Sequence, residues 1–312
     1  MKTFGELKQL HIEISSMCNA RCPGCPRNYY GFPQDASIVQ TNLTLAKFKT
    51  IVSMNLLQQL EQIWFNGNYG DFVMNDEGPD IVEYVLSLNP LMDINISTNG
   101  SARNKTYWER LGHTGVKVWF CLDGLEDTHS LYRQDTNFNQ ILKNAQYFQS
   151  AGGKLIWQYT IFDHNSHQIE EARELSKKLN FTDFVTRTNN RGSMPVYNRK
   201  GEKVFSIGSS PAAKNASNLL DVSTIPIKIM HIRENNLPGD ISCESLGTLS
   251  AYISATGDVW PCCYLAFEDK EDGIFLENGS INASTEYFPL VQEKWKTIPH
   301  KSCKHFCSKK SS

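Results

Sequence analysis

Six strand-like segments alternate with helix-like segments over the first 190 residues, and this alternation limits the available folds more than any other feature. Each strand-like segment is a short, largely apolar or alternating run, and residues with helical apolar spacing follow it. The predicted strands are Leu10–Ser15, Gln62–Gly67, Asp93–Ser97, Val116–Leu122, Lys154–Phe162 and Asp183–Thr188. Repeats of about 30 residues with a helix in each connection predict a parallel sheet with right-handed crossovers.

The connections between these strands carry the helical patterns. Helices are predicted in Thr44–Leu60, from Gly78 and Pro79 onward, and in Asn104–Leu111, Asn137–Ala151 and Ser166–Leu179. Six strand–helix units are too few for a closed eight-stranded barrel. We therefore predict an α/β fold in which residues 1–190 form a partial (β/α)6 TIM-like barrel, with ligands at the carboxyl ends of the strands.

The pattern changes after residue 190. Residues 191–242 are rich in Asn, Ser, Pro and Lys and show little periodicity, which predicts an irregular linker and possible substrate region. Two strand-like runs around Thr256, Gly257 and Asp258 then predict a β-hairpin. We place a small C-terminal domain, the hairpin followed by a helix, at residues 243–312.

Composition excludes several classes of partner. A formal net charge of −2 gives no global reason to expect nucleic acid or an anionic membrane surface as partner. Neither a signal peptide nor an apolar run of membrane-spanning length is evident, so a cytoplasmic location without membrane contact is predicted. In that reducing compartment the nine cysteines would persist as thiols or metal thiolates.

Three cysteines are grouped in the loop after the first predicted strand. Cys18, Cys22 and Cys25 are separated by three and then two residues. Thiolates with this spacing on a tight loop can converge on one [4Fe–4S] cluster and leave its fourth iron without a protein ligand. A zinc site is the alternative, but zinc sites usually close with a fourth Cys or His, and no obvious one is nearby.

This C-x3-C-x2-C loop after the first strand of a partial barrel resembles the signature of the radical S-adenosylmethionine (SAM) enzymes. The resemblance implies that SAM binds at the open iron and that an external one-electron donor, such as flavodoxin or ferredoxin, reduces the cluster. SAM is then cleaved to methionine and a 5′-deoxyadenosyl radical, which abstracts hydrogen from a substrate C–H bond.

The strand ends also resemble this family. The stretch after the second strand occupies the place of the family's glycine-rich SAM-binding segment, although it departs from the usual Gly-Gly-Glu-Pro form. The polar end of the third strand, and Asp123 with Arg133 after the fourth, match further positions of the family. The resemblance implies cofactor-binding roles for Gly67, Asn68, Tyr69, Gly70, Asp71, Ser97, Thr98, Asn99, Arg133 and Asn165. Asp123 is a candidate catalytic residue.

A second group of cysteines lies in the predicted C-terminal domain. The spacing of Cys243, Gly257 and Cys262 resembles the opening of the SPASM and twitch extensions of radical SAM enzymes. The resemblance implies an auxiliary [4Fe–4S] cluster that accepts an electron, with the ligands Cys243, Cys262, Cys303 and Cys307. Structural zinc is the rival. Cys262 and Cys263 would point to opposite faces of a strand, and the spacing from Gly257 favours Cys262.

The remaining predictions concern the reaction. Cys121 is predicted to be a buried core residue; if it points into the barrel, it could donate a hydrogen atom to a substrate radical. Only seventeen residues precede Cys18, without a peptide-recognition domain, and this favours oxidation of a small molecule. Modification of a peptide is the alternative, and a non-catalytic iron–sulfur or zinc protein is the second alternative.

Overall fold

The computed structural model describes residues 7–32, 34–189, 192–208, 245, 248, 250–267 and 303. In these ranges eight strands form one sheet, in the order β10-β9-β1-β2-β3-β4-β5-β6. The barrel strands are β1 (Gln9–Ile12), β2 (Gln62–Phe65), β3 (Asp93–Thr98), β4 (Lys117–Cys121), β5 (Lys154–Ile161) and β6 (Asp183–Thr188). Each is parallel to its neighbour, so all six carboxyl ends meet at one edge of the sheet.

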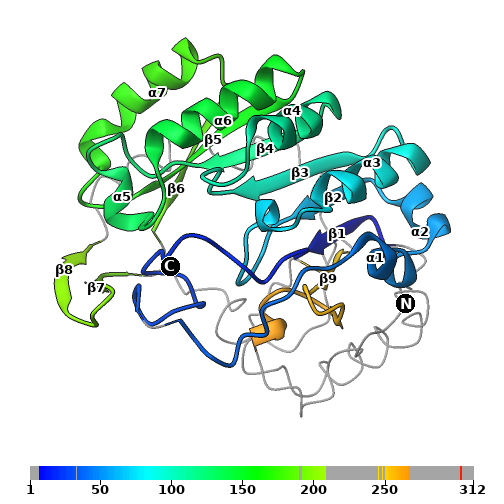
Figure 1. Ribbon diagram of the computed structural model, residues 1–312, viewed down its shortest axis with the longest axis horizontal. Coiled ribbons are helices and arrows are strands. Elements are labelled where there is room, and N and C mark those ends of the chain that lie inside the picture. Colours follow the sequence, from blue (N-terminus) through cyan, green and yellow to red (C-terminus); the bar gives the residue numbers. More distant parts are fainter. Residues whose placement is uncertain are drawn as a thin grey trace.

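Helices occupy every connection between these strands. They are α1 (Leu45–Ile51), α2 (Met54–Gln59), α3 (Gly78–Leu88), α4 (Lys105–His113), α5 (His129–Tyr132), α6 (Phe138–Ser150) and α7 (Ile169–Lys178). Short 3₁₀ segments are η2 (Phe72–Met74), η3 (Ser166–Gln168) and η5 (Leu265–Phe267). Figure 1 shows α3, α4, α6 and α7 along one face of the curved sheet. The predicted α/β fold with six parallel strands is confirmed.

The single helix predicted for Thr44–Leu60 is wrong, because the chain breaks at Val52 into α1 and α2. Val52 is extended, with φ −109° and ψ 107°. The side chain of Ser53 then accepts a hydrogen bond from the backbone N–H of Leu56 and begins α2. An N-capping serine inside an otherwise helical apolar pattern was the signal for two helices.

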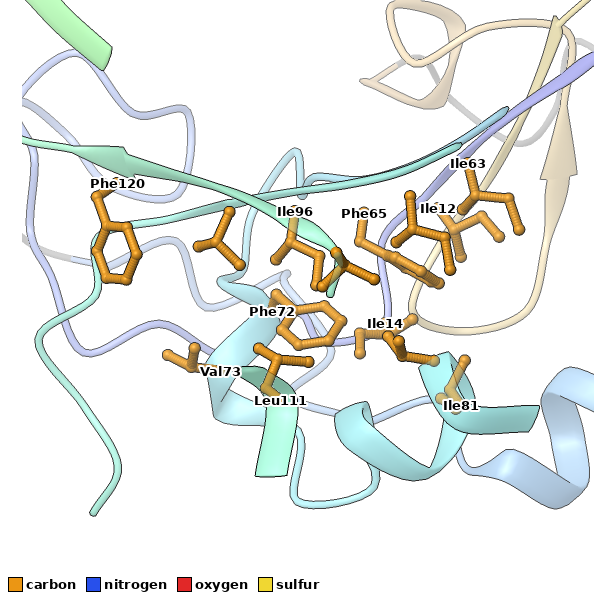
Figure 2. Close-up of a cluster of buried hydrophobic side chains, with 14 of the residues drawn as sticks. Ile12, Ile14, Ile63, Phe65, Phe72, Val73, Ile81, Ile96, Leu111 and Phe120 are labelled. Carbon is orange, nitrogen blue, oxygen red and sulfur yellow. The ribbon is translucent and has the colours of Figure 1, made fainter. Parts of the chain in front are cut away.

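The main core lies between the sheet and its helices. Figure 2 shows side chains from the strands, among them Ile63, Phe65 and Ile96, packed over Phe72 and Ile81. Burying side chains of this size contributes about 1.5–3 kcal/mol each. Residues that alternate with them along the strands occupy the other, inner face of the sheet. There Trp64, Trp119, Ile156 and Val185 form a separate cluster.

The predicted C-terminal hairpin is present and continues the barrel sheet. β9 (Ser250–Ile253) pairs in parallel with β1, with Ala251 opposite Leu10. β10 (Val259–Trp260) returns antiparallel to β9 through a turn in which Gly257 has φ +89°. The sequence did not indicate this pairing with β1. Most of the residues after the hairpin, where the sequence predicts a helix, lie outside the described residues.

A second hairpin occupies part of the predicted linker. β7 (Met194–Tyr197) and β8 (Lys203–Ile207) pair antiparallel, so residues 194–207 are not the irregular structure expected there. Met194 and Val196 are buried on one face of β7, but two apolar positions were too short a pattern to reveal a strand. Most of the remaining linker, residues 209–242, lies outside the described part. No helix among the described residues is long and apolar enough to cross a membrane.

Candidate active site

The loop after β1 brings its three cysteines into one cluster at the carboxyl edge of the sheet. Cys22 is buried, Cys18 and Cys25 are half-buried, and all three pack in a cluster that includes Tyr132 and Phe162. Burial, followed by the charge of Asp71 and of the other two cysteines, raises the pKa of the Cys18 thiol well above its usual range. Burial raises the pKa of Cys22 to about 11. A metal centre bound here would have to displace the protons of these thiols.

The donor set fits an iron–sulfur cluster. Within the described ranges, no three His, Cys, Asp or Glu side chains converge closely enough to hold a single metal ion. A [4Fe–4S] cluster makes a different demand, because each thiolate binds a different iron atom around the cube. Three thiols on one loop, packed together and not joined by a disulfide, are ligands of the type and number that such a cluster needs.

Polar side chains from the end of β3 and from the C-terminal end of α5 reach two of the sulfur atoms. Nη1 of Arg133 lies 3.7 Å from Sγ of Cys22, and Nδ2 of Asn99 lies 3.7 Å from Sγ of Cys18. The backbone N–H of Ala20 also donates to Sγ of Cys18, over 3.4 Å. Hydrogen bonds to cysteine sulfur stabilise the negative charge of a ligating thiolate and tune its cluster.

Asp71 organises the end of β3. Its carboxylate accepts hydrogen bonds from Thr98 Oγ1 (2.6 Å), from the backbone N–H of Asn99 (2.7 Å) and from Asn99 Nδ2 (2.8 Å). The same amide nitrogen lies 2.9 Å from Oδ1 of Asn19, in the cysteine loop. Burial raises the pKa of Asp71, and these hydrogen bonds oppose the rise. The end of β3 and the cysteine loop are thus joined through Asn99.

A buried ion pair lies at the end of β4. Oδ2 of Asp123, which is fully buried, accepts from Nε of Arg133 at 2.6 Å, and its Oδ1 accepts from the backbone N–H of Thr160 at 2.6 Å. Nδ1 of His129 accepts from the backbone N–H of Asp123 at 3.2 Å. Nε2 of His129 must therefore carry the ring proton of the neutral imidazole, and it lies 3.0 Å from Thr136 Oγ1.

The glycine-rich stretch after β2 lies against the end of β1. Gly70 approaches the backbone of Ser15 so closely that a Cβ atom would overlap its carbonyl oxygen. Oε1 of Glu13 accepts from the backbone N–H groups of Tyr69 (2.7 Å) and Gly70 (2.8 Å). Sequence reasoning missed Glu13. Its signal was an acidic residue in the predicted strand directly before the cysteine loop.

Two other predicted site residues face different surroundings. Asn165 is fully buried, and its side chain binds the backbone of its own turn: Oδ1 accepts from Phe162 N (2.8 Å) and Nδ2 donates to Thr160 O (3.0 Å). Cys121 alternates with core residues of β4 and so lies on the inner face, where Gln158 Nε2 approaches its Sγ at 3.5 Å. Burial raises the pKa of Cys121 to about 11.

The second cysteine group lies beside the β9–β10 hairpin. Cys262, Cys263 and Cys303 pack against Tyr252 and the rest of a small buried cluster. Burial raises the pKa of Cys262 to about 12, and the nearby charges of Cys263 and Cys303 add to the rise. Nδ2 of Asn68 donates to the backbone carbonyl of Cys263 at 2.8 Å. Cys243 and Cys307 lie outside the described residues.

Comparisons with known proteins agree with this arrangement. No protein-family model matches the chain. The chain is 22% identical over 296 residues to a cysteine-type anaerobic sulfatase-maturating enzyme of Clostridium novyi, covering 87% of this chain and 77% of that enzyme. Its fold resembles that of anSMEcpe with bound AdoMet, with a TM-score of 0.59, 17% identity, and coverage of 97% of this chain and 84% of that one.

Streptococcus suis SuiB bound to S-adenosylmethionine has a similar fold, with a TM-score of 0.54 and 15% identity. The match covers 82% of this chain and 60% of SuiB, so the chain spans less than two thirds of that protein. The likeness to these solved structures concerns the fold, whereas the similarity to the Clostridium enzyme lies in the sequence of most of the chain. The cysteine loop at the carboxyl edge of a partial barrel thus lies in a fold similar to those of anSMEcpe and SuiB, which have been solved with S-adenosylmethionine bound, and in a chain similar in sequence to an anaerobic sulfatase-maturating enzyme.

Proposed function

We propose that this chain is a radical SAM enzyme in which Cys18, Cys22 and Cys25 hold a [4Fe–4S] cluster that binds and cleaves SAM. One observation carries the proposal: the three thiols share a buried cluster at the carboxyl edge, and donors from the end of β3 and from the C-terminal end of α5 reach two of their sulfur atoms. When bound, the cluster and SAM supply a one-electron cleavage that yields methionine and a 5′-deoxyadenosyl radical able to abstract hydrogen from carbon.

The surrounding side chains hold the ligand loop in place. Arg133 and Asn99 donate toward the sulfurs of Cys22 and Cys18 and stabilise their negative charge as ligands. Asp123 holds Arg133 through the ion pair, and Asp71 holds Asn99 through two hydrogen bonds. Both carboxylates are therefore proposed as positioning residues rather than as proton donors.

We assign SAM binding to the Asn66–Asp71 stretch and the polar end of β3, because both lie against the cysteine loop. The backbone N–H of Asp71 donates to the carbonyl of Met17 in that loop at 2.8 Å. Gly67 and Gly70 lack a side chain where the backbone segments approach most closely. The amides of Asn68 and Asn165 are bound to protein carbonyls, so these two residues support the site through its backbone.

A peptide is the proposed substrate, in place of the small molecule that the sequence favoured. SuiB has been solved with its precursor peptide SuiA, at a TM-score of 0.51 and 16% identity to this chain. anSMEcpe has been solved with AdoMet and the Cp18Cys peptide, at a TM-score of 0.54 and 14% identity. These peptide-bound relatives support a peptidyl C–H bond as the site of hydrogen abstraction.

The second cysteine group is proposed to hold the auxiliary [4Fe–4S] cluster, with Cys262 and Cys303 joined by Cys243 and Cys307. When bound, this cluster would supply an acceptor for one electron from the substrate radical, which would also lose a proton to solvent. Together with the hydrogen atom taken by the deoxyadenosyl group, this amounts to a two-electron oxidation of the substrate. The packing of Cys262 and Cys303 in one cluster supports the assignment.

Anaerobic reconstitution followed by an assay for 5′-deoxyadenosine tests the proposal. The reconstituted chain should bind about eight iron atoms and release 5′-deoxyadenosine from SAM and dithionite. C22A should lose nearly all of this activity and about four of the iron atoms, whereas C303A should lose about four iron atoms and retain SAM cleavage. A reconstituted chain that binds iron and never cleaves SAM would contradict the proposal.

Cys121 supports a second outcome of the reaction. Its thiol lies on the inner face and keeps its proton at neutral pH, because burial raises its pKa to about 11. It can return a hydrogen atom to the substrate radical, and the resulting thiyl radical is restored by one electron from the external donor and one proton. In D2O the product of this route would carry one deuterium, and C121A would lose that label. If the native chain gave unlabelled product in D2O, hydrogen return by Cys121 would be excluded, and oxidation of the substrate would remain as the proposed outcome.

A further inference from the structure

We propose that Glu13 is a positioning residue that holds the Tyr69–Gly70 backbone for SAM and ties it to the β9–β10 hairpin through Tyr252. The inference rests on the proposed function, because it concerns the same SAM site. Glu13 directly follows β1 and is only 2% exposed. It belongs to neither cysteine group, yet its carboxylate contacts the segments that lead to both.

The two carboxylate oxygens of Glu13 are bound on opposite sides. Oε1 accepts two backbone N–H groups, from Tyr69 at 2.7 Å and Gly70 at 2.8 Å. Oε2 accepts the hydroxyl of Tyr252 at 2.7 Å. A buried carboxylate requires such donors, since without them its burial would be strongly unfavourable. Removing the carboxylate therefore frees two donors of the SAM-binding stretch and one of the hairpin together.

The hairpin side of this arrangement is equally buried. Tyr252 lies in β9, is 1% exposed, and belongs to the small cluster that contains Cys262, Cys263 and Cys303. The backbone N–H of Glu13 also donates to the carbonyl of Ile253 at 2.8 Å. Glu13 is thus bound through both its main chain and its side chain to the strand beside the second cysteine group.

A second, independent contact joins the same two segments. Nδ2 of Asn68 donates to the carbonyl of Cys263 at 2.8 Å. On the other side of the stretch, Nη1 of Arg27 donates to the carbonyl of Tyr69 at 3.1 Å, and the guanidinium is itself buried. Among the described residues, Glu13 and Arg27 thus bind the backbone of Tyr69 and Gly70, whereas Glu13 and Asn68 link the stretch to Tyr252 and Cys263.

Steady-state kinetics of SAM cleavage by the reconstituted enzyme test the proposal. Replacing Glu13→Ala should raise KM for SAM about tenfold or more, because three hydrogen bonds to one carboxylate are lost. Glu13→Gln keeps an oxygen for the two backbone donors and should stay within about threefold of the native KM. Tyr252→Phe removes one donor only and should raise KM by about threefold to tenfold. In each case kcat should change less than KM.

The matched control is Glu61→Ala, which removes an exposed glutamate whose partner is Lys8 at the surface. It should leave KM for SAM unchanged. The change that SAM induces in the electron paramagnetic resonance spectrum of the reduced cluster supplies a second readout, and it should weaken in Glu13→Ala and recover in Glu13→Gln.

A native KM and a native spectral change in folded Glu13→Ala and Tyr252→Phe would overturn the inference. Should Glu13→Ala fail to fold, Tyr252→Phe and Glu13→Gln decide the matter by the same criteria. A native chain that neither cleaves SAM nor changes its spectrum with SAM would instead refute the proposed function.

Discussion

Among the buried carboxylates that the structure describes, Glu13, Asp71 and Asp123 stand near the carboxyl ends of barrel strands, and each is bound by several donors. Glu13 accepts three hydrogen bonds, Asp71 accepts from Thr98 and Asn99, and Asp123 accepts from Arg133 and a backbone N–H. None of these acids is thereby free to act alone on a substrate. Their common task is to fix backbone and donor groups around the cysteine loop, so that little reorganisation is needed when a ligand binds.

Gly70 should tolerate no side chain. In Gly70→Ala the new Cβ would overlap the carbonyl oxygen of Ser15, which belongs to the backbone and cannot move aside cheaply. We expect SAM affinity to fall at least about tenfold, measured by equilibrium binding to the reconstituted enzyme. Gly115→Ala is the control: its φ of +69° brings some strain, but nothing lies within 4 Å, so only stability should fall.

His129 should make stability depend on pH between about 6.5 and 4. Burial lowers its pKa from 6.5 in the unfolded chain to about 4 in the fold, so the unfolded state binds the extra proton first. Stability is therefore full above pH 6.5 and falls as the pH drops toward 4, by at most about 3 kcal/mol. Urea unfolding of the chain without added iron measures this. H129Q should be less stable at pH 7 and should show a flatter dependence on pH.

Part of the site was predictable from local sequence and part was not. The spacing of Cys18, Cys22 and Cys25 identifies their loop, since the ligands of one cluster are neighbours in the chain. Glu13 and Tyr252 are 239 residues apart, and no local pattern predicts that a carboxylate and a hydroxyl so distant will meet. Such pairs follow from the topology of the sheet, which depends on every strand together.

At the scale of elements, strands with strong apolar patterns were predicted well, and short ones were not. β2 to β6 begin within a residue of their predicted starts, because apolar residues at successive or alternating positions mark their buried faces. The β7–β8 hairpin has few buried positions of its own. It packs instead on the cysteine loop, where Met194, Val196 and Ile207 share a cluster with Cys22.

Asp135 should hold the β7–β8 hairpin on the cysteine loop. Its carboxylate accepts from Nε of Arg21 in that loop at 2.5 Å and from Nη2 of Arg199 in the hairpin turn at 2.7 Å. D135N keeps the side-chain shape and tolerates the φ of +64° at this position. We expect faster amide hydrogen exchange in residues 194–207, corresponding to about 1 kcal/mol of lost protection, since both pairs are partly exposed. E202Q, a substitution within the hairpin, is the control and should leave the amide hydrogen exchange of residues 194–207 unchanged.

At the scale of the whole molecule, β9 makes the C-terminal hairpin part of the barrel sheet. Because β1 lies between β2 and β9, its backbone is paired on both sides. This pairing places the second cysteine group within reach of the Asn66–Asp71 stretch, through Asn68 and Cys263. The two cysteine groups are thus joined by the sheet as well as by side chains.

A chain that ends at residue 208 should therefore be unstable. Without β9, one edge of β1 would be left unpaired, and unpaired strand edges promote association between chains. We expect this truncation to aggregate or to unfold at lower urea concentration than the full chain, as measured by light scattering and circular dichroism. In the full chain, the amides of β1 and β9 should exchange together. A stable, monomeric truncation would show that the hairpin folds independently of the barrel.

The parallel pairing of β1 with β9 also constrains the order of events during synthesis. β1 leaves the ribosome almost at once, but its second neighbour begins only at Ser250. At roughly 5–20 residues per second, the nascent chain carries an open strand edge for on the order of ten to fifty seconds. Both cysteine groups therefore reach their final surroundings late. Iron delivered before β9 is synthesised would meet a cysteine loop whose preceding strand, β1, still lacks its pairing with β9.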